Sequence, residues 1–153
     1  MARILGIDID RSAVRGAVLK TAFRSVEVER YVQIPLAEAP NTPGSLPELH
    51  DAFASMLRAL GKPPDISVSA LDGEHASLRV IELPVAARKR VAEVLPFELE
   101  SLLPFDVEDA VIDHQPIDTQ DGQMRLLTAA VLQKRVREHL EPFNNTELDP
   151  REV

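Results

Sequence analysis

The sequence lacks cysteine and tryptophan altogether, and aromatic residues make up only 4% of its 153 residues. The absence of cysteine excludes disulfide bonds, thiolate zinc sites and cysteine nucleophiles. Because 44% of the residues are nevertheless hydrophobic, the core must be aliphatic, built from leucine, valine, isoleucine and alanine. A chain of this length can bury enough surface for one domain, or for one core that carries an inserted subdomain.

Positive charge is also scarce, since the sequence has 17 Lys and Arg residues against 25 Asp and Glu residues, which gives a net charge of -8. Such a chain repels phosphate backbones and anionic membrane surfaces, which argues against nucleic acid as a partner. The longest apolar run, near 126–132, is far shorter than the roughly 20 residues that span a bilayer. The N-terminus becomes acidic too early for a signal peptide. We therefore expect a cytoplasmic chain with no direct membrane insertion.

The first third of the chain is expected to form a three-stranded meander. Apolar stretches at 4–9, 13–19 and 26–34 are joined by short links, which favours antiparallel pairing. A Pro-, Asn- and Gly-rich loop at 37–44 then precedes a helix that ends at Gly61. The third stretch alternates with period two. This alternation predicts five residues on one face of the strand: Val26, Val28, Arg30, Val32 and Ile34.

The rest of the chain is expected to contain four strands and two helices. Pro96 predicts a kink or a break within the first of these helices. Asp121-Gly122 predicts the tight turn of a hairpin. The last residues, 149–153, resemble the entry to a further strand. The expected strands are 66–71, 77–83, 111–117 and 125–132, and the expected helices are 85–103 and a last one that begins near Leu132.

The segment GIDIDRS at 6–12 joins the first two expected strands and is the candidate functional site. It allows two interpretations, a plain hairpin turn or a loop whose backbone amides bind a nucleotide phosphate. A phosphate loop needs a glycine where the backbone approaches the ligand, and here Asp10 brings a charge that repels phosphate. Arg11 could offset part of that charge, and Ser12 retains a hydroxyl. We therefore interpret Asp8, Asp10, Arg11 and Ser12 as a degenerate phosphate loop.

Other catalytic patterns are missing from the sequence. There is no Walker loop, no G-x-S-x-G elbow and no spacing that marks a Ser–His pair. Glu98 and Glu100 occupy helical positions that do not face each other, and the acids at 106–109 indicate a solvated loop. We expect no metal and no cofactor. The four histidines lack the spacing of metal ligands: His50, His75, His114 and His139.

Two groups of residues resemble a known family. The first is ILGIDI at 4–9, followed by SAVRGAVL at 12–19. The second is Glu98 followed by LPF at 103–105, VIDHQ at 111–115 and the strand at 126–132. Over nearly its whole length, the chain resembles the family that contains the PilM proteins of type IV pili and the GspL proteins of type II secretion. Both are relatives of the cell-division protein FtsA.

The resemblance implies an actin-like (ribonuclease H-like) α/β lobe with a mixed sheet and a small inserted α+β subdomain of the FtsA-like kind. Residues 1–74 and 133–153 would form the core subdomain, and residues 75–132 the insert. A second lobe is expected beyond Val153. PilM-type loops read Asp-Ile-Gly-Ser or similar, whereas this chain has Asp10 and Arg11 there. This departure argues against nucleotide binding and favours the secretion branch.

By this resemblance, the expected function is a cytoplasmic scaffold of the inner-membrane platform of a type II secretion system, and not an enzyme. GspL-like proteins recruit the assembly ATPase, a GspE-like protein, and join platform proteins of the GspM or PilN kind. Three alternatives remain. A PilM-like protein would grip the N-terminal tail of PilN, an actin-like ATPase would use Asp8 to position a metal ion or water, and a filament protein would polymerise as FtsA does. The sequence leaves open whether the chain forms a homodimer.

Overall fold

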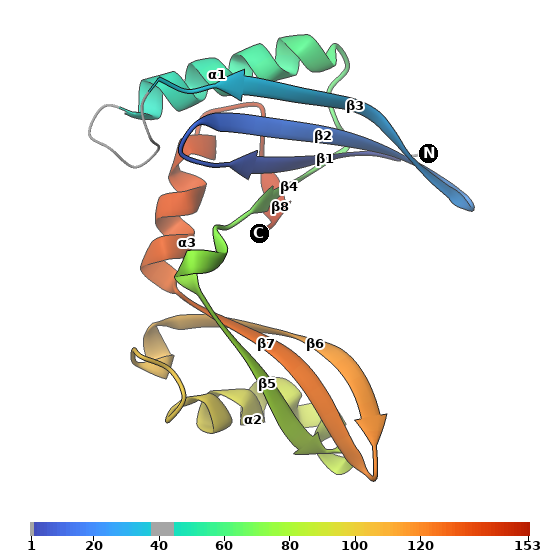
Figure 1. Cartoon of the computed structure of the whole chain (residues 1–153), viewed down its shortest axis with the longest axis vertical. Coiled ribbons are helices and arrows are strands. Elements are labelled where there is room, and N and C mark those ends of the chain that lie inside the picture. The colour runs from blue at the N-terminus through green and yellow to red at the C-terminus, as the bar shows by residue number, and fades with distance from the viewer. Residues whose placement is uncertain (1, 38–44) are drawn as a thin grey trace. The chain divides into compact units, whose positions relative to one another are not determined.

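The structure is a computed structural model that describes residues 2–37 and 45–153 (Figure 1). The chain divides into two compact units, which we call the core unit (Met1–Asp72 with Glu138–Val153) and the inserted unit (Gly73–Arg137). Each unit has its own sheet and its own apolar cluster. Most of the loop expected at 37–44 lies outside the described residues.

The core unit contains a five-stranded sheet with the order β3-β2-β1-β4-β8. The first three strands form the antiparallel meander that the sequence predicts, whereas β4 pairs parallel to β1 and β8 pairs parallel to β4. The sheet is therefore mixed. Its strands are β1 (Ala2–Ile9), β2 (Ala13–Ala22), β3 (Ser25–Pro35), β4 (Ile66–Ala70) and the short β8 (Pro150–Glu152).

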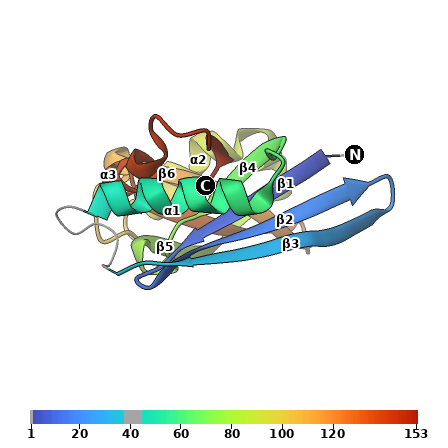
Figure 2. The same cartoon turned by 90° about the horizontal axis from the view of Figure 1, so that it is seen from above.

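Helix α1 (Ser45–Leu60) lies against one face of this sheet (Figure 2). Gly61 ends the helix as predicted, because its φ of 74° lies in the left-handed region. After α3 (Gln133–Leu140), a short 3-10 turn (Glu141–Phe143) returns to the same core. There the rings of Phe143 and Phe53 stack with centroids 4.8 Å apart. The core unit is therefore closed by residues from both ends of the chain.

Strand β3 contains a bulge that the sequence pattern did not reveal. Leu19 pairs with Val28, but the next residue back, Val18, pairs with Arg30. Glu29 is therefore an extra residue in β3, and the side chains on either side of it switch faces.

The bulge makes the predicted five-residue face wrong. Val32 and Ile34 lie on the α1 face and are partly buried against the core. Val26 and Val28 instead lie on the opposite face, 65% and 69% exposed. Because a bulge resets the period-two alternation, a pattern that is continuous in the sequence is divided into two halves. The apolar side chains of the two halves lie on opposite faces of the sheet.

The inserted unit is an antiparallel three-stranded sheet with the order β5-β7-β6. Its strands are β5 (Ala76–Pro84), β6 (Ala110–Gln120) and β7 (Gln123–Leu132). Asp121 and Gly122 form the predicted turn between β6 and β7, with φ values of 52° and 75°. Positive φ at both central residues is typical of a type I′ turn, whose twist matches that of the flanking strands.

Helix α2 (Val91–Leu99) packs on one face of this second sheet. The helix expected over 85–103 is shorter than predicted, because Val85–Arg90 forms a 3-10 turn. Arg90, with φ -124° and ψ 19°, leaves helical geometry, so the break lies there and Pro96 is accommodated inside α2. Two further 3-10 turns are found at Gly73–His75 and Val107–Asp109. The buried cluster of the unit comprises Ile81, Leu83, Val91, Leu95, Leu99, Met124 and Leu126.

Candidate functional site

The candidate loop lies at the tight connection between β1 and β2. Ile9 and Val14 form the last pair of the β1–β2 ladder. The backbone N–H of Asp10 then donates to the carbonyl of Ala13 at 3.0 Å and closes the turn. Arg11 and Ser12 lie exposed at its tip. The loop is therefore a short, hydrogen-bonded turn between two strands.

The carboxylate of Asp10 accepts three hydrogen bonds from the loop and one from Arg15. Its Oδ1 receives the backbone N–H groups of Ser12 and Ala13 at 2.7 and 2.9 Å, and the Ser12 hydroxyl at 2.8 Å. Its Oδ2 receives the guanidinium of Arg15. The Ser12 N–H, then Arg15 and then the Ser12 hydroxyl hold the pKa of Asp10 well below its usual range. The anion bound by the loop amides is therefore the loop's own Asp10 carboxylate.

Arg15 belongs to the site although the sequence analysis did not select it. Its Nη1 also donates to Oδ2 of Asp8 at 3.1 Å, so that one guanidinium connects the two carboxylates. Asp8 and Arg15 are directly opposite each other in the β1–β2 ladder. A predicted register between the two expected strands would have revealed this contact, because it places Arg15 opposite Asp8.

This arrangement opposes phosphate binding at the loop. A phosphate would need the amides of Ser12 and Ala13, which already bind the Asp10 carboxylate. It would also meet the negative charges of Asp8 and Asp10 at close range, with Arg15 already paired to both. The four predicted site residues do lie together, but they form a turn whose Ser12 and Ala13 amides are already hydrogen-bonded to its own Asp10 carboxylate.

Beside the loop, an apolar pocket of about 370 Å³ opens on the sheet face opposite α1. Gly6 and Ala17, which pair across β1 and β2, form its floor. Tyr31 and Val68 line it from the neighbouring strands, and Asp8 lies at its rim. The pocket can accept an apolar group, but it offers few polar atoms with which to orient a substrate.

A serine and a histidine do meet in the fold, although no sequence spacing marked them. The Ser69 hydroxyl on β4 lies 2.9 Å from Nε2 of His139 on α3. Ser69 is only 3% exposed, so a substrate has no access to its hydroxyl. Burial lowers the pKa of His139 and keeps the ring neutral near pH 7. This pair is a packing contact of the core.

The acidic loop after α2 lines a second cavity, of about 400 Å³, in the inserted unit. Its acids, which include Glu100, Asp106 and Glu108, are exposed. Within residues 2–37 and 45–153, no three His, Asp or Glu side chains gather closely enough to hold a metal ion. Over the same described residues, no helix is both long and apolar enough to cross a membrane.

Comparisons with known proteins identify the fold. No protein-family model matches the sequence, and a search of curated proteins found no match. Among solved structures, the chain is similar to one described as a PilM–PilN type IV pilus biogenesis complex. The TM-score is 0.78 at 23% sequence identity, over 97% of this chain and 46% of that one.

The chain is also similar to the cytoplasmic domain of EpsL, an inner membrane component of the type II secretion system of Vibrio cholerae. In this case the TM-score is 0.63 at 16% identity, over 98% of this chain and 56% of that one. The chain therefore has the actin-like α/β fold of the PilM and GspL proteins, which confirms the predicted fold class. It spans about half the length of each of the two solved structures.

Proposed function

We propose that this chain is a scaffold domain, not an enzyme, in the inner-membrane platform of a bacterial type II secretion or type IV pilus machine. The observation that carries the proposal is the Asp10 carboxylate on the loop amides, in a fold shared with two platform proteins. In an actin-like ATPase, the equivalent loop would have to be free for phosphate. A scaffold needs a rigid surface and no such free site.

The first candidate role is GspL-like. In this role the chain recruits the assembly ATPase to the cytoplasmic side of the inner membrane and joins platform proteins of the GspM kind. Two features support it. Asp10 and Arg11 replace the residues of a PilM-type loop, and the net charge of -8 favours a basic docking surface on the partner.

The second candidate role is PilM-like, with the N-terminal tail of a PilN-type membrane protein as the ligand. The observation that favours it is the structural similarity itself. The TM-score to the structure of the PilM–PilN complex, 0.78, exceeds the 0.63 to the EpsL domain. Both candidates place the chain at an inner-membrane platform, and they differ in the machine to which the platform belongs and in the partner that the chain binds.

Calorimetric titration of the chain separates these candidates. Three ligands are compared: the N-terminal domain of the cognate assembly ATPase, a PilN-type tail peptide, and Mg-ATP. We expect one of the two protein ligands to bind and Mg-ATP to give no heat of binding. Binding of the ATPase domain alone supports the GspL-like role, whereas binding of the tail alone supports the PilM-like role.

Asp10→Gly is the matched variant for the nucleotide arm, because it removes the carboxylate and leaves the loop amides in place. Scaffold binding should be unchanged in this variant if Asp10 acts only on its own loop. Binding of Mg-ATP by the unmodified chain, without either protein ligand, would contradict the proposal and favour an actin-like ATPase.

A further inference from the structure

The hairpin between β2 and β3 extends beyond the end of α1 (Figure 1). Arg30, which pairs with Val18, donates to the carbonyl of Ala59 at 2.6 Å and so marks the last turn of the helix. Ala22, the last residue of β2, lies four residues further along the strand, a distance of about 14 Å at 3.4 Å per residue. We call the projecting residues 19–28 the hairpin arm.

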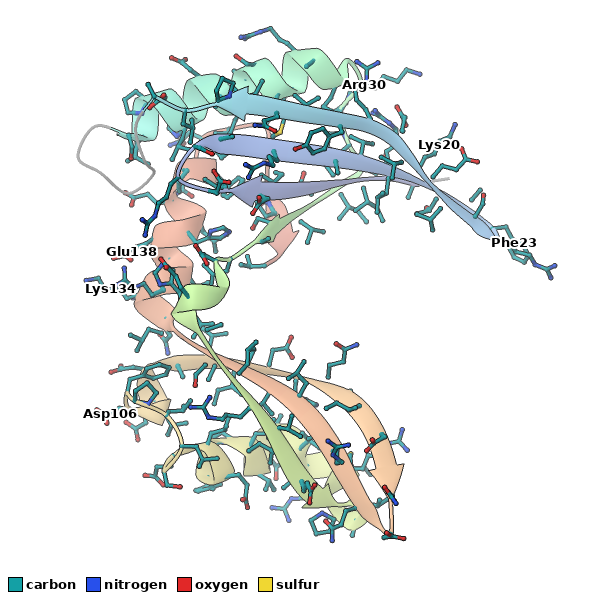
Figure 3. All side chains as sticks on the ribbon, viewed as in Figure 1. Lys20, Phe23, Arg30, Asp106, Lys134 and Glu138 are labelled. Atoms are coloured by element: carbon teal, nitrogen blue, oxygen red, sulfur yellow. The ribbon has the colours of Figure 1, made fainter. Side chains whose placement is uncertain are left out.

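The hairpin arm carries an exposed aromatic ring at its tip (Figure 3). Phe23 and Arg24 form the two-residue turn, and Phe23 is 95% exposed. The guanidinium of Arg24 lies 5.5 Å from the centroid of the ring. Turns of this length favour Asn, Asp and Gly, as the other hairpin shows with Asp121-Gly122. Neither turn geometry nor burial among the described residues explains a phenylalanine at this position.

Two further apolar side chains are exposed on the hairpin arm. Val26 and Val28 lie on the sheet face opposite α1 and are 65% and 69% exposed. Together with Phe23, they gather exposed apolar surface at one end of the core unit. Single exposed apolar residues are ordinary, but a group of them marks a contact with another molecule or with a membrane.

The charge of the hairpin arm has the opposite sign to that of the whole chain. The arm contains two cations, Lys20 and Arg24, and one acid, Glu27, which lies opposite Lys20 in the β2–β3 ladder. The neighbouring Glu29 accepts two hydrogen bonds from the guanidinium of Arg3 and is thereby neutralised. The arm therefore has one excess positive charge, in a chain whose net charge is -8.

This combination matches the layered chemistry of a membrane surface. An apolar ring enters the hydrocarbon boundary, while a long cationic side chain beside it stays at the level of the lipid phosphates. The net charge of -8 argues against a membrane contact of the chain as a whole. However, salt screens charges beyond roughly 8 Å at physiological ionic strength, which is shorter than the projecting arm. A surface that meets the tip therefore responds mainly to the charge of the arm itself.

We infer that the tip of the hairpin arm binds the surface of a membrane that contains anionic phospholipid. Phe23 enters the apolar boundary, and Arg24 and Lys20 lie at the phosphates. The contact is peripheral and needs no membrane-spanning helix. One ring and one excess charge make it weak and reversible, because stable anchoring takes more than one signal. The lipid contact does not rest on the proposed function, since it is tested with lipid alone.

The absence of tryptophan from the sequence allows a direct test of insertion. Phe23→Trp places a single indole at the tip, whose emission moves to shorter wavelength when it leaves water. The full chain is titrated with vesicles of phosphatidylcholine, with and without phosphatidylglycerol. We expect a blue shift with the mixed vesicles and quenching by lipids brominated on their acyl chains. Phe97→Trp is the matched control, because Phe97 is 77% exposed but lies on α2 of the inserted unit, and it should show neither effect.

Cosedimentation with the same vesicles measures what each side chain contributes. Phe23→Ser should lower the partition coefficient about tenfold, as expected for the loss of one buried apolar side chain. Arg24→Gln should lower it about fivefold at low salt. Phe97→Ser and Arg88→Gln are the matched controls, since they change an exposed phenylalanine and an exposed arginine of the inserted unit. Both should bind as the unmodified chain does, and circular dichroism verifies that all four variants fold.

Several results would overturn the inference. One is an emission of Phe23→Trp that no vesicle shifts, and another is vesicle binding that Phe23→Ser does not weaken. Equal binding to phosphatidylcholine alone would exclude the part given to charge, and a loss in Arg88→Gln equal to that in Arg24→Gln would exclude the arm as its location. A shift of Phe23→Trp caused by the N-terminal domain of the assembly ATPase, and not by vesicles, would assign the tip to a protein interface.

Discussion

At the scale of single residues, Asp10 organises the candidate loop. In the sequence, the Asp10 carboxylate argued against a phosphate loop, because it lies where the backbone would approach the ligand. In the structure, the same carboxylate binds the loop amides. A side chain that satisfies nearby N–H groups stabilises a turn, as Asp residues commonly do. The loop therefore owes its shape to a local anion and does not need a ligand.

The depressed pKa of Asp10 predicts acid sensitivity of the core unit. Because the folded-state pKa lies below the unfolded-state value of about 4, the unfolded state binds more protons between these values. The free energy of unfolding therefore falls as the pH drops below about 4. Asp10→Asn should lower stability near neutral pH, and its difference from the unmodified chain should shrink progressively in acid.

Denaturant unfolding followed by the fluorescence of Tyr31, the sole tyrosine, measures this effect in the core unit. Asp51→Asn, an exposed position on α1, is the control and should follow the unmodified chain at every pH. A gap between Asp10→Asn and the unmodified chain that stays constant from neutral to acid pH would contradict the role given to the Asp10 carboxylate.

The sequence predicted the members of the loop but not its contacts. Asp8, Asp10 and Ser12 could be selected because a polar segment between two apolar stretches is visible in the sequence. Arg15 was missed because it lies within the second strand, and only the register that pairs it with Asp8 brings it to the site. The bonds to Asp10 depend on the backbone path of the turn, which residue types alone do not determine.

At the scale of elements, the contact between α1 and β2 depends on one glycine. A Cβ atom added at Gly16 would lie 2.5 Å from Sδ of Met56 and 3.3 Å from Cδ1 of Leu5. Both side chains are fully buried. The absence of a side chain at Gly16 therefore lets the helix approach the sheet closely, which is a packing requirement because interiors are dense.

Gly16→Ala should destabilise the core unit by about 1 to 3 kcal/mol, because overpacking forces buried side chains out of their rotamers. Gly6→Ala is the matched control on the adjacent strand, where the nearest atom to an added Cβ is 3.9 Å away. We expect Gly6→Ala to be close to neutral. Chemical denaturation of both variants measures the difference, and equal losses would show that the α1 contact is not the cause.

Elements with strong local signals were predicted, and elements shaped by their neighbours were not. The Asp121-Gly122 turn was predictable because few residue pairs adopt positive φ at both positions. The bulge at Glu29 was not, since the sequence of β3 alternates without interruption on both sides of it. The extra residue becomes visible only in the pairing with β2. The exposure of Val26 and Val28 on the sheet face opposite α1 follows from this unpredicted feature.

At the scale of the whole molecule, the chain forms the first part of one core, completes a second unit, and then returns to the first. The core cluster combines Leu5 and Phe53 from the first part with Phe143 and Leu148 from the last. The inserted unit draws its buried cluster entirely from 81–126. The inserted unit is therefore built from one continuous segment of the chain, whereas the core unit needs two segments that are far apart in the sequence.

This difference predicts the behaviour of fragments. Residues 73–137 contain all three strands of their sheet, helix α2 and their whole cluster, so they should fold alone. Their stability should be modest, because a chain of about 60 residues buries only about 60% of its unfolded surface. Residues 1–72 lack β8 and the Phe143 ring that stacks on Phe53, so they should fail to form a cooperative core.

Dispersion of amide NMR signals, together with thermal unfolding by circular dichroism, distinguishes these outcomes. The 73–137 fragment should give dispersed signals and one cooperative transition, and the 1–72 fragment should give neither. Joining 1–72 to 138–153 through a short flexible linker should restore cooperative folding, because it returns the missing strand and ring. A cooperative 1–72 fragment would show that the last part of the chain is not needed to close the core.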